Sequence, residues 1–216
     1  MNDTETKNTA VKAPALMSTR PVTAQDALDQ CEKLSPMMVH YCQTKTGLTD
    51  PANTILFYRL GDFYEMFFED ATLVSKELEL TLTGKDCGME ERAPMCGIPY
   101  HAAEGYINRL VENGHKVAIC EQMEDPKQAK GMVKREVIRV VTPGTTLIPQ
   151  GLDETKNNYI MSIVCMEGCF GISTADISTG QCLVTEMGKP RRLVDEITKF
   201  MPAEISCNQS VLLCGI

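Results

Sequence analysis

The sequence predicts an α/β protein of two units, a small mixed sheet with helices followed by a second unit rich in strands. Two observations lead to this prediction. The apolar run Thr54–Arg59 has the length of a buried strand, and apolar residues at helical spacing follow it after Gly61. Further along, three strand-like segments separated by glycine-containing turns precede one helix and another strand. A chain of 216 residues suits one large domain or two small ones.

Elements of the first unit follow from local signals. Residues 1–33 read as an N-terminal extension, disordered over 1–22 and weakly helical after Thr23. Ser35 as N-cap and Pro36 in the first turn start a helix that runs to about residue 45. The other expected elements are a strand at 54–60, a helix at 62–79, a short strand at 80–83, a polar loop at 84–92, a turn at 97–100, a helix at 101–113 ended by Gly114, a strand at 116–122, a short helix after Asp125 and a strand at 133–142.

A polar, aperiodic segment at 146–158 predicts a linker between a first domain at 34–145 and a second at 159–216. In the second domain we expect strands at 159–166, 170–178 and 181–187, a helix at 190–200 and a strand from 203.

Cysteine usage argues against a metal site. The chain has ten cysteines and three histidines, but no Cys-x-x-Cys pair and no histidine at a zinc-finger offset. Many of the cysteines lie among apolar residues, where reduced thiols pack as small hydrophobic groups, and this predicts a cytoplasmic protein. No apolar stretch reaches the roughly 18 residues of a membrane helix, so we expect no membrane contact.

The strand end at Gly61-Asp62 is open to two interpretations. Asp62 and Glu65 have the spacing of a capping box, and Phe63 and Phe67 could begin the core stripe of a helix. Alternatively, the strand end presents Phe63 and Glu65 outward, where an aromatic ring could wedge between bases and a carboxylate could bond a base edge.

Net charge is −8, which argues against a protein that coats DNA by charge alone. Residues 127–139 depart from this acidic balance. The basic residues there outnumber the single acid Glu136, and they are Lys127, Lys130, Lys134, Arg135 and Arg139. The segment is either a solvated face or an edge that contacts phosphates.

Five ordered motifs make the chain resemble the bacterial MutS DNA mismatch-repair proteins from residue 34 to the C-terminus. The motifs are Leu34–Met38, Phe57–Phe67, Pro94–Ala102, Val117–Gln122 and Arg139–Thr145. The resemblance implies a mismatch-recognition domain at 34–145 and a truncated, ribonuclease-H-like connector domain at 159–216.

The resemblance also implies a function, namely binding of double-stranded DNA that carries mismatches or small loops. Phe63 would stack on a mispaired base in the minor groove and Glu65 would hydrogen-bond that base. Tyr64, Lys127, Lys130, Lys134 and Arg135 complete the implied DNA-binding residues. A homodimer, a mismatch-repair partner protein, and ATP with magnesium are implied for the full-length family.

No catalysis is expected from these residues themselves. A phosphate-binding P-loop needs Gly-x-x-x-x-Gly-Lys-Ser/Thr. Gly84-Lys85 is followed by Asp86 and Gly188-Lys189 by Pro190, and neither pair has the required upstream glycine. Two other functions stay open. One is a metal-dependent nuclease on the second unit, for which Asp176, Asp195 and Glu196 are the candidate ligands. The other is a protein-interaction module that binds no DNA on its own.

Overall fold

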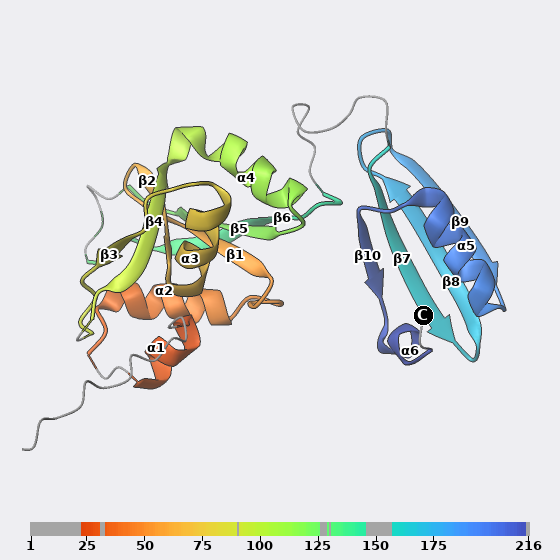
Figure 1. The fold of residues 1–216 in the computed structure, drawn as a ribbon, viewed down its shortest axis with the longest axis horizontal. Coiled ribbons are helices and arrows are strands. Elements are labelled where there is room, and N and C mark those ends of the chain that lie inside the picture. The colour runs from red at the N-terminus through yellow and green to blue at the C-terminus, as the bar shows by residue number, and fades with distance from the viewer. Residues whose placement is uncertain are drawn as a thin grey trace, which may run out of the picture.

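The computed structural model describes residues 23–30, 33–89, 91–125, 129, 131–145 and 157–214. It confirms the α/β fold class, with one mixed sheet in each unit (Figure 1). The predicted tail at 1–22, the short helix after Asp125 and most of the predicted linker fall outside the described residues.

The first unit contains eleven described elements. They are α1 (Ala24–Gln30), α2 (Pro36–Thr46), β1 (Thr54–Leu60), β2 (Phe63–Phe67), α3 (Phe68–Glu77), β3 (Thr83–Lys85), β4 (Ala93–Pro99), the 3-10 turn η1 (Tyr100–Ala102), α4 (Ala103–Glu112), β5 (Lys116–Gln122) and β6 (Arg135–Val141).

Helices cover both faces of the first sheet, whose strand order is β3-β4-β2-β1-β5-β6. Strand β1 runs parallel to β5, and the other neighbouring strands are antiparallel. Because successive side chains of a strand point to opposite faces, Ile55 and Phe57 pack with α3 and α4, whereas Leu56 and Tyr58 pack with α1 and α2. The central strand β1 is therefore buried on both sides.

Helix α1 follows Thr23 and α2 follows the predicted N-cap Ser35, as expected. The Thr23 hydroxyl accepts a hydrogen bond from Asp26 N–H at the start of α1, and Ser35 accepts one from Met38 N–H at the start of α2. Ala24 and Ala27 are buried against α2, so α1 contributes to the core of the first unit although it lies within the predicted extension.

The predicted helix at 62–79 is wrong in its first third. Gly61, at φ +59°, forms the tight turn of a hairpin, and Phe63–Phe67 forms strand β2 between β1 and β4. The helix starts only at Phe68, and no side chain caps it, so the predicted capping box of Asp62 and Glu65 does not form. Pairing with two neighbouring strands satisfies the backbone of β2, and this outweighs the local helical spacing.

Two smaller predictions also need correction. The predicted strand at 80–83 lies instead at 83–85, where it pairs with β4. The predicted turn at 97–100 is the end of β4 followed by η1, because Gly97 pairs with Glu65. A Cβ at Gly97 would lie 3.3 Å from the Tyr64 carbonyl oxygen, so this glycine permits the close approach of β4 to β2.

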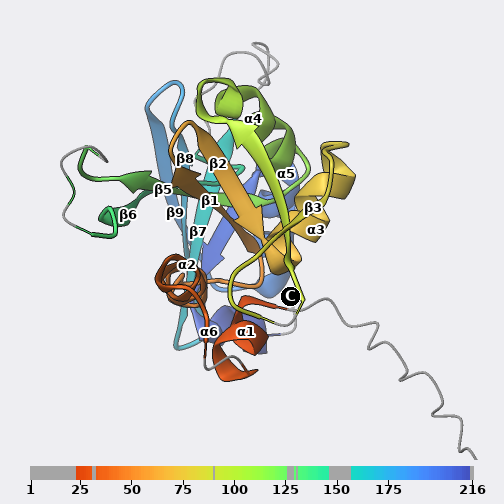
Figure 2. The same ribbon diagram turned by 90° about the vertical axis from the view of Figure 1, so that its left-hand side faces the viewer.

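The predictions for α4 and β5 are confirmed. Ile107, Leu110 and Val111 of α4 face the core, Gly114 follows the helix at φ +91°, and β5 spans Lys116–Gln122. Figure 2 shows the hairpin of β5 and β6 (green) extending beyond the helices of the first unit.

The second unit has the predicted order of three strands, a helix and a fourth strand. Its sheet order is β10-β7-β8-β9, and α5 packs against the face formed by Met161, Ile163, Phe170 and Ile172 (Figure 1). The elements are β7 (Tyr159–Met166), β8 (Cys169–Asp176), β9 (Gln181–Met187), α5 (Pro190–Phe200), β10 (Glu204–Cys207) and the short helix α6 (Gln209–Leu213).

Among the described residues, no helix combines the length and the apolar character that crossing a membrane requires.

Candidate nucleic-acid interface

Five strands of the first sheet begin or end at the same end of the sheet. Because β1 and β5 are parallel, their last residues Leu60 and Gln122 lie side by side, and β6 begins where β5 ends. Strand β2 begins and β4 ends at the same place, since Phe63 pairs with both Leu60 and Pro99. We call this region, formed by residues 60–63, 99–100, 122–125 and 131–135, the hairpin end.

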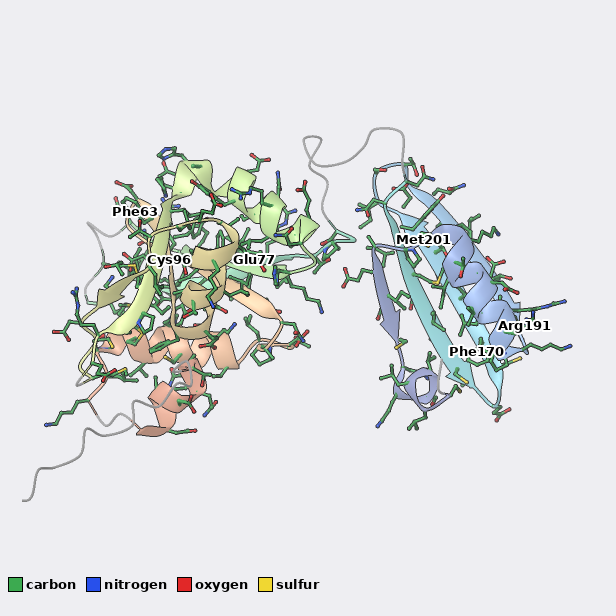
Figure 3. The ribbon with its side chains drawn as sticks, viewed as in Figure 1. Phe63, Glu77, Cys96, Phe170, Arg191 and Met201 are labelled. Atoms are coloured by element: carbon green, nitrogen blue, oxygen red, sulfur yellow. The ribbon has the colours of Figure 1, made fainter. Side chains whose placement is uncertain are left out.

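Phe63 is the first residue of β2 and projects from the hairpin end (Figure 3). Its side chain is 47% exposed, whereas Phe57, Phe67 and Phe68 are fully buried. An exposed phenylalanine at a strand end contributes little to the core, so its ring is free to contact another molecule.

Glu65 lies on the same face of β2 as Phe63, because the two are two residues apart in a strand. Lys85 Nζ on β3 donates a hydrogen bond to Glu65 Oε2 at 2.5 Å, and both side chains are partly exposed. The aromatic ring and the carboxylate of the predicted site are thus brought together, with a neutralising cation that the sequence analysis did not identify.

Tyr64 points to the opposite face and is buried among the residues that α3 and α4 cover. Its hydroxyl donates a hydrogen bond to Glu121. Burial, together with this bond to the carboxylate, raises the pKa of Tyr64 to about 12. The structure therefore places Tyr64 in the core and not beside Phe63 and Glu65.

Arg59 and Tyr100 form a second feature of the hairpin end that sequence reasoning missed. The Arg59 guanidinium lies 3.7 Å from the centroid of the half-exposed Tyr100 ring and pairs with Glu121 at 3.4 Å. Gln122 Oε1 accepts a hydrogen bond from Gly61 N–H, which ties the β1–β2 turn to β5. Residues from three of the sequence motifs thus contact one another and brace the turn that precedes Phe63.

The predicted basic residues have different surroundings. Arg135 is buried, donates hydrogen bonds to the carbonyl oxygens of Arg59 and Val133, and lies 5.3 Å from the Tyr58 ring centroid. Arg135 therefore fastens β6 to β1. Lys134 lies at the surface, where its exposed ammonium pairs with the exposed carboxylate of Glu136 at 2.7 Å. Lys127 and Lys130 lie outside the described residues.

The candidate nuclease ligands do not assemble into a metal site. In the described part of the chain, no group of three or more His, Cys, Asp or Glu side chains could hold an ion. Asp176 is buried and accepts hydrogen bonds from Ser178, which lower the pKa of its carboxyl. Asp195 is exposed, and Glu196 pairs with Lys199.

Comparison with known proteins explains why these motifs occur together. The family model described as MutS domain I matches residues 35–149, and the model described as MutS domain II matches residues 158–212. This chain belongs to the MutS family.

Curated relatives agree with this assignment. DNA mismatch repair protein MutS of Lachnoclostridium phytofermentans is 64% identical over 184 residues, which cover 85% of the chain and 19% of that relative. The proteins of the same name from Acetivibrio thermocellus and Alkaliphilus metalliredigens are 56% and 55% identical, over 81% and 80% of the chain and 20% of each relative. The chain thus spans about one fifth of the length of these relatives.

Proposed function

We propose that this chain binds mismatched double-stranded DNA in mismatch repair, through a wedge formed by Phe63 and a base contact made by Glu65. One observation carries the proposal. An exposed phenylalanine and a carboxylate share one face at a strand end, where the motifs of a MutS recognition domain hold them together. Exposed Lys134 lies at the same edge of the sheet and supplies a phosphate contact.

Discrimination would come mainly from the DNA. Inserting an apolar side chain between base steps costs a few kcal/mol per step, because stacking is lost and the duplex kinks. A mismatch has already lost part of its pairing and stacking, so it deforms at a lower cost than a matched pair. The position of Phe63 at a braced strand end supports this role, since a wedge must keep its geometry while it displaces a base.

Glu65 needs the cation beside it. Phosphates surround a carboxylate that approaches DNA, and their repulsion would oppose binding. Lys85, at 2.5 Å, neutralises this charge while one carboxylate oxygen keeps capacity to accept another hydrogen bond. The pair therefore lets a carboxylate be presented to a base edge at a smaller electrostatic cost.

The longer relatives suggest further properties for a full-length protein of this family. We propose that a homodimer, a mismatch-repair partner protein and an ATP site with magnesium depend on parts of the longer relatives that this chain does not match. We propose that the chain itself carries no nucleotide site and acts in the cytoplasm as the DNA-recognising portion.

The proposed function predicts weak, salt-sensitive binding with a preference for mismatches. We expect a Kd at or weaker than about 10⁻⁴–10⁻⁶ M at physiological salt, because one wedge with a short basic edge makes few phosphate contacts. Fluorescence anisotropy with labelled duplexes that differ only by one mismatched or unpaired base measures the preference. Equal affinity for both duplexes would contradict the wedge, and no binding at any salt concentration would favour a protein-interaction module.

Glu65→Gln tests the base contact. Removing the negative charge should raise affinity for the perfect duplex and lower the preference for the mismatch, as measured by the same anisotropy titrations. Glu186→Gln on the outer part of the second sheet removes the same charge elsewhere and serves as the control. If Glu65→Gln changed the affinity for both duplexes by the same factor, Glu65 would act only through overall charge.

A further inference from the structure

The short helix α6 is fastened to β7 around Cys165. The Asn208 side chain accepts a hydrogen bond from Cys165 N–H at 3.0 Å and donates one to the Cys165 carbonyl oxygen at 3.1 Å. Val211 of α6 is buried in the core of the second unit. Helix α6 therefore has a defined position on this strand.

This docking brings two thiols together. Cys214 follows α6, and its sulfur lies 4.0 Å from the sulfur of Cys165, although the residues are 49 positions apart in the sequence. Cys165 is buried on the face that packs with α5, and Cys214 is exposed. A disulfide needs a sulfur–sulfur distance of about 2.05 Å, which a rotation of the exposed Cys214 side chain can approach.

We propose that Cys165 and Cys214 form a redox modification site, in which a hydroperoxide converts the two thiols into a disulfide. The Cys214 thiolate attacks the peroxide oxygen, which gives a sulfenic acid and releases water when the peroxide is H2O2. The Cys165 thiolate then attacks the Cys214 sulfur and expels a second water. Overall, two thiols and one peroxide give one disulfide and two waters, so the thiols are oxidised and the peroxide is reduced.

The positions and burial of three other cysteines make them less suited to form this disulfide than Cys165 and Cys214. Cys169 is also close along the hairpin, but it pairs with Met166 and projects from the face opposite to Cys165. In the first unit Cys96 and Cys120 are buried, and burial raises the pKa of each thiol to about 12, which suppresses the reactive thiolate. Exposed Cys214 combines access to solvent with a second thiol within reach.

Reaction rate should depend on pH. Partial desolvation beside the core and the hydrogen bond with Cys165 raise the pKa of the exposed Cys214 thiol, so little thiolate exists at neutral pH. We therefore expect slow oxidation at pH 7 that accelerates by up to about tenfold per pH unit as the pH rises toward this pKa.

The test treats the whole 216-residue chain with hydrogen peroxide at low micromolar protein and follows thiols by Ellman titration after unfolding. We expect the loss of two thiols per chain, a mass lower by two hydrogens, a peptide that links Cys165 to Cys214, and full reversal by dithiothreitol. The oxidised chain should also unfold at a temperature higher by about 5 °C, because the bond closes a long loop.

Two variants decide between this site and general thiol oxidation. Cys214→Ser should abolish the disulfide, while Cys207→Ser, which alters another exposed cysteine of the same C-terminal segment, should leave it unchanged. Disulfide formation that persists in Cys214→Ser would overturn the proposal. So would irreversible oxidation of Cys214 without loss of the Cys165 thiol, or a cross-link found only between chains on a non-reducing gel.

Discussion

Replacing Phe63 with alanine should abolish the preference for mismatched DNA and leave the fold nearly unchanged. The ring is half-exposed at the end of β2, so its removal should lower the free energy of unfolding by less than about 1 kcal/mol. Without the ring nothing fills the space between unstacked bases, and the mismatched and perfect duplexes should bind equally. Anisotropy titrations of both duplexes and a thermal melt of the variant measure the two effects.

Two control variants make this result specific. Leu82→Ala removes another apolar side chain that is also 47% exposed, but it precedes β3, which pairs with Ala93–Met95 and not with the Pro99 end of β4 beside Phe63, so it should change neither stability nor the mismatch preference. Phe57→Ala removes a fully buried ring and should cost about 3–5 kcal/mol. If Phe63→Ala melted like Phe57→Ala, or retained the preference, the wedge interpretation would be wrong.

Lys45→Met should destabilise the first unit by about 3–5 kcal/mol near pH 7.5, because it leaves a buried carboxylate without its partner. Lys45 Nζ donates hydrogen bonds to Asp70 Oδ1 and to the Thr54 carbonyl oxygen, each at 2.6 Å, and both charged side chains are buried. Asp70 Oδ2 accepts a further bond from Leu56 N–H. Without the ammonium, a buried carboxylate that braces α3 against β1 loses its counter-charge.

The loss should shrink at acidic pH. Burial raises the pKa of Asp70 to about 6, even though the Lys45 ammonium opposes this effect. A raised pKa means that folding favours the protonated carboxyl of Asp70. The stability that this protonation contributes is therefore fully present below the ordinary aspartate pKa, and it is lost as the pH rises through the pKa of the folded state. The variant should have a still higher pKa, and its deficit should therefore grow between pH 5 and pH 7.5.

Urea unfolding at several pH values, followed by tyrosine fluorescence, measures this deficit. The chain has no tryptophan and six tyrosines, five of which lie in the first unit, so the signal reports mainly on that unit. Lys116→Met is the matched control, because the Lys116–Asp50 pair is partly exposed and should contribute less than about 1 kcal/mol. Equal deficits in the two variants, or a deficit that does not change with pH, would contradict the role assigned to the buried pair.

The sequence predicts well those helices and strands that have a clear hydrophobic period and a turn at their end. Helix α4, strand β5 and the meander of β7, β8 and β9 have clear periodicity and glycine-containing turns, and the structure confirms them. Strand β2 was missed because its residues fit a helical stripe locally. What fixes β2 as a strand is pairing with β4, about 30 residues further along the chain, and such pairing is invisible to a local pattern.

The same limit applies to the candidate site. Phe63 and Glu65 were identified from their motif, and the structure places them on one face. Tyr64 was grouped with them because the alternation of β2 had not been recognised, and that alternation turns it into the core. A count of basic residues could not distinguish buried Arg135 from exposed Lys134, and Lys85 reaches Glu65 only through the pairing of β3 and β4 with β2.

The two chain positions that flank segment 146–156 meet in space. Asn158 Nδ2 donates a hydrogen bond to the Pro143 carbonyl oxygen at 3.0 Å, and a Cβ at Gly144 would lie 2.5 Å from Ile160 Cγ1. These contacts join the end of the first unit to the start of β7 at positions on either side of segment 146–156. A side chain at Gly144 would collide with Ile160 and Glu204, so a bulkier residue there would force the two sides of this contact apart.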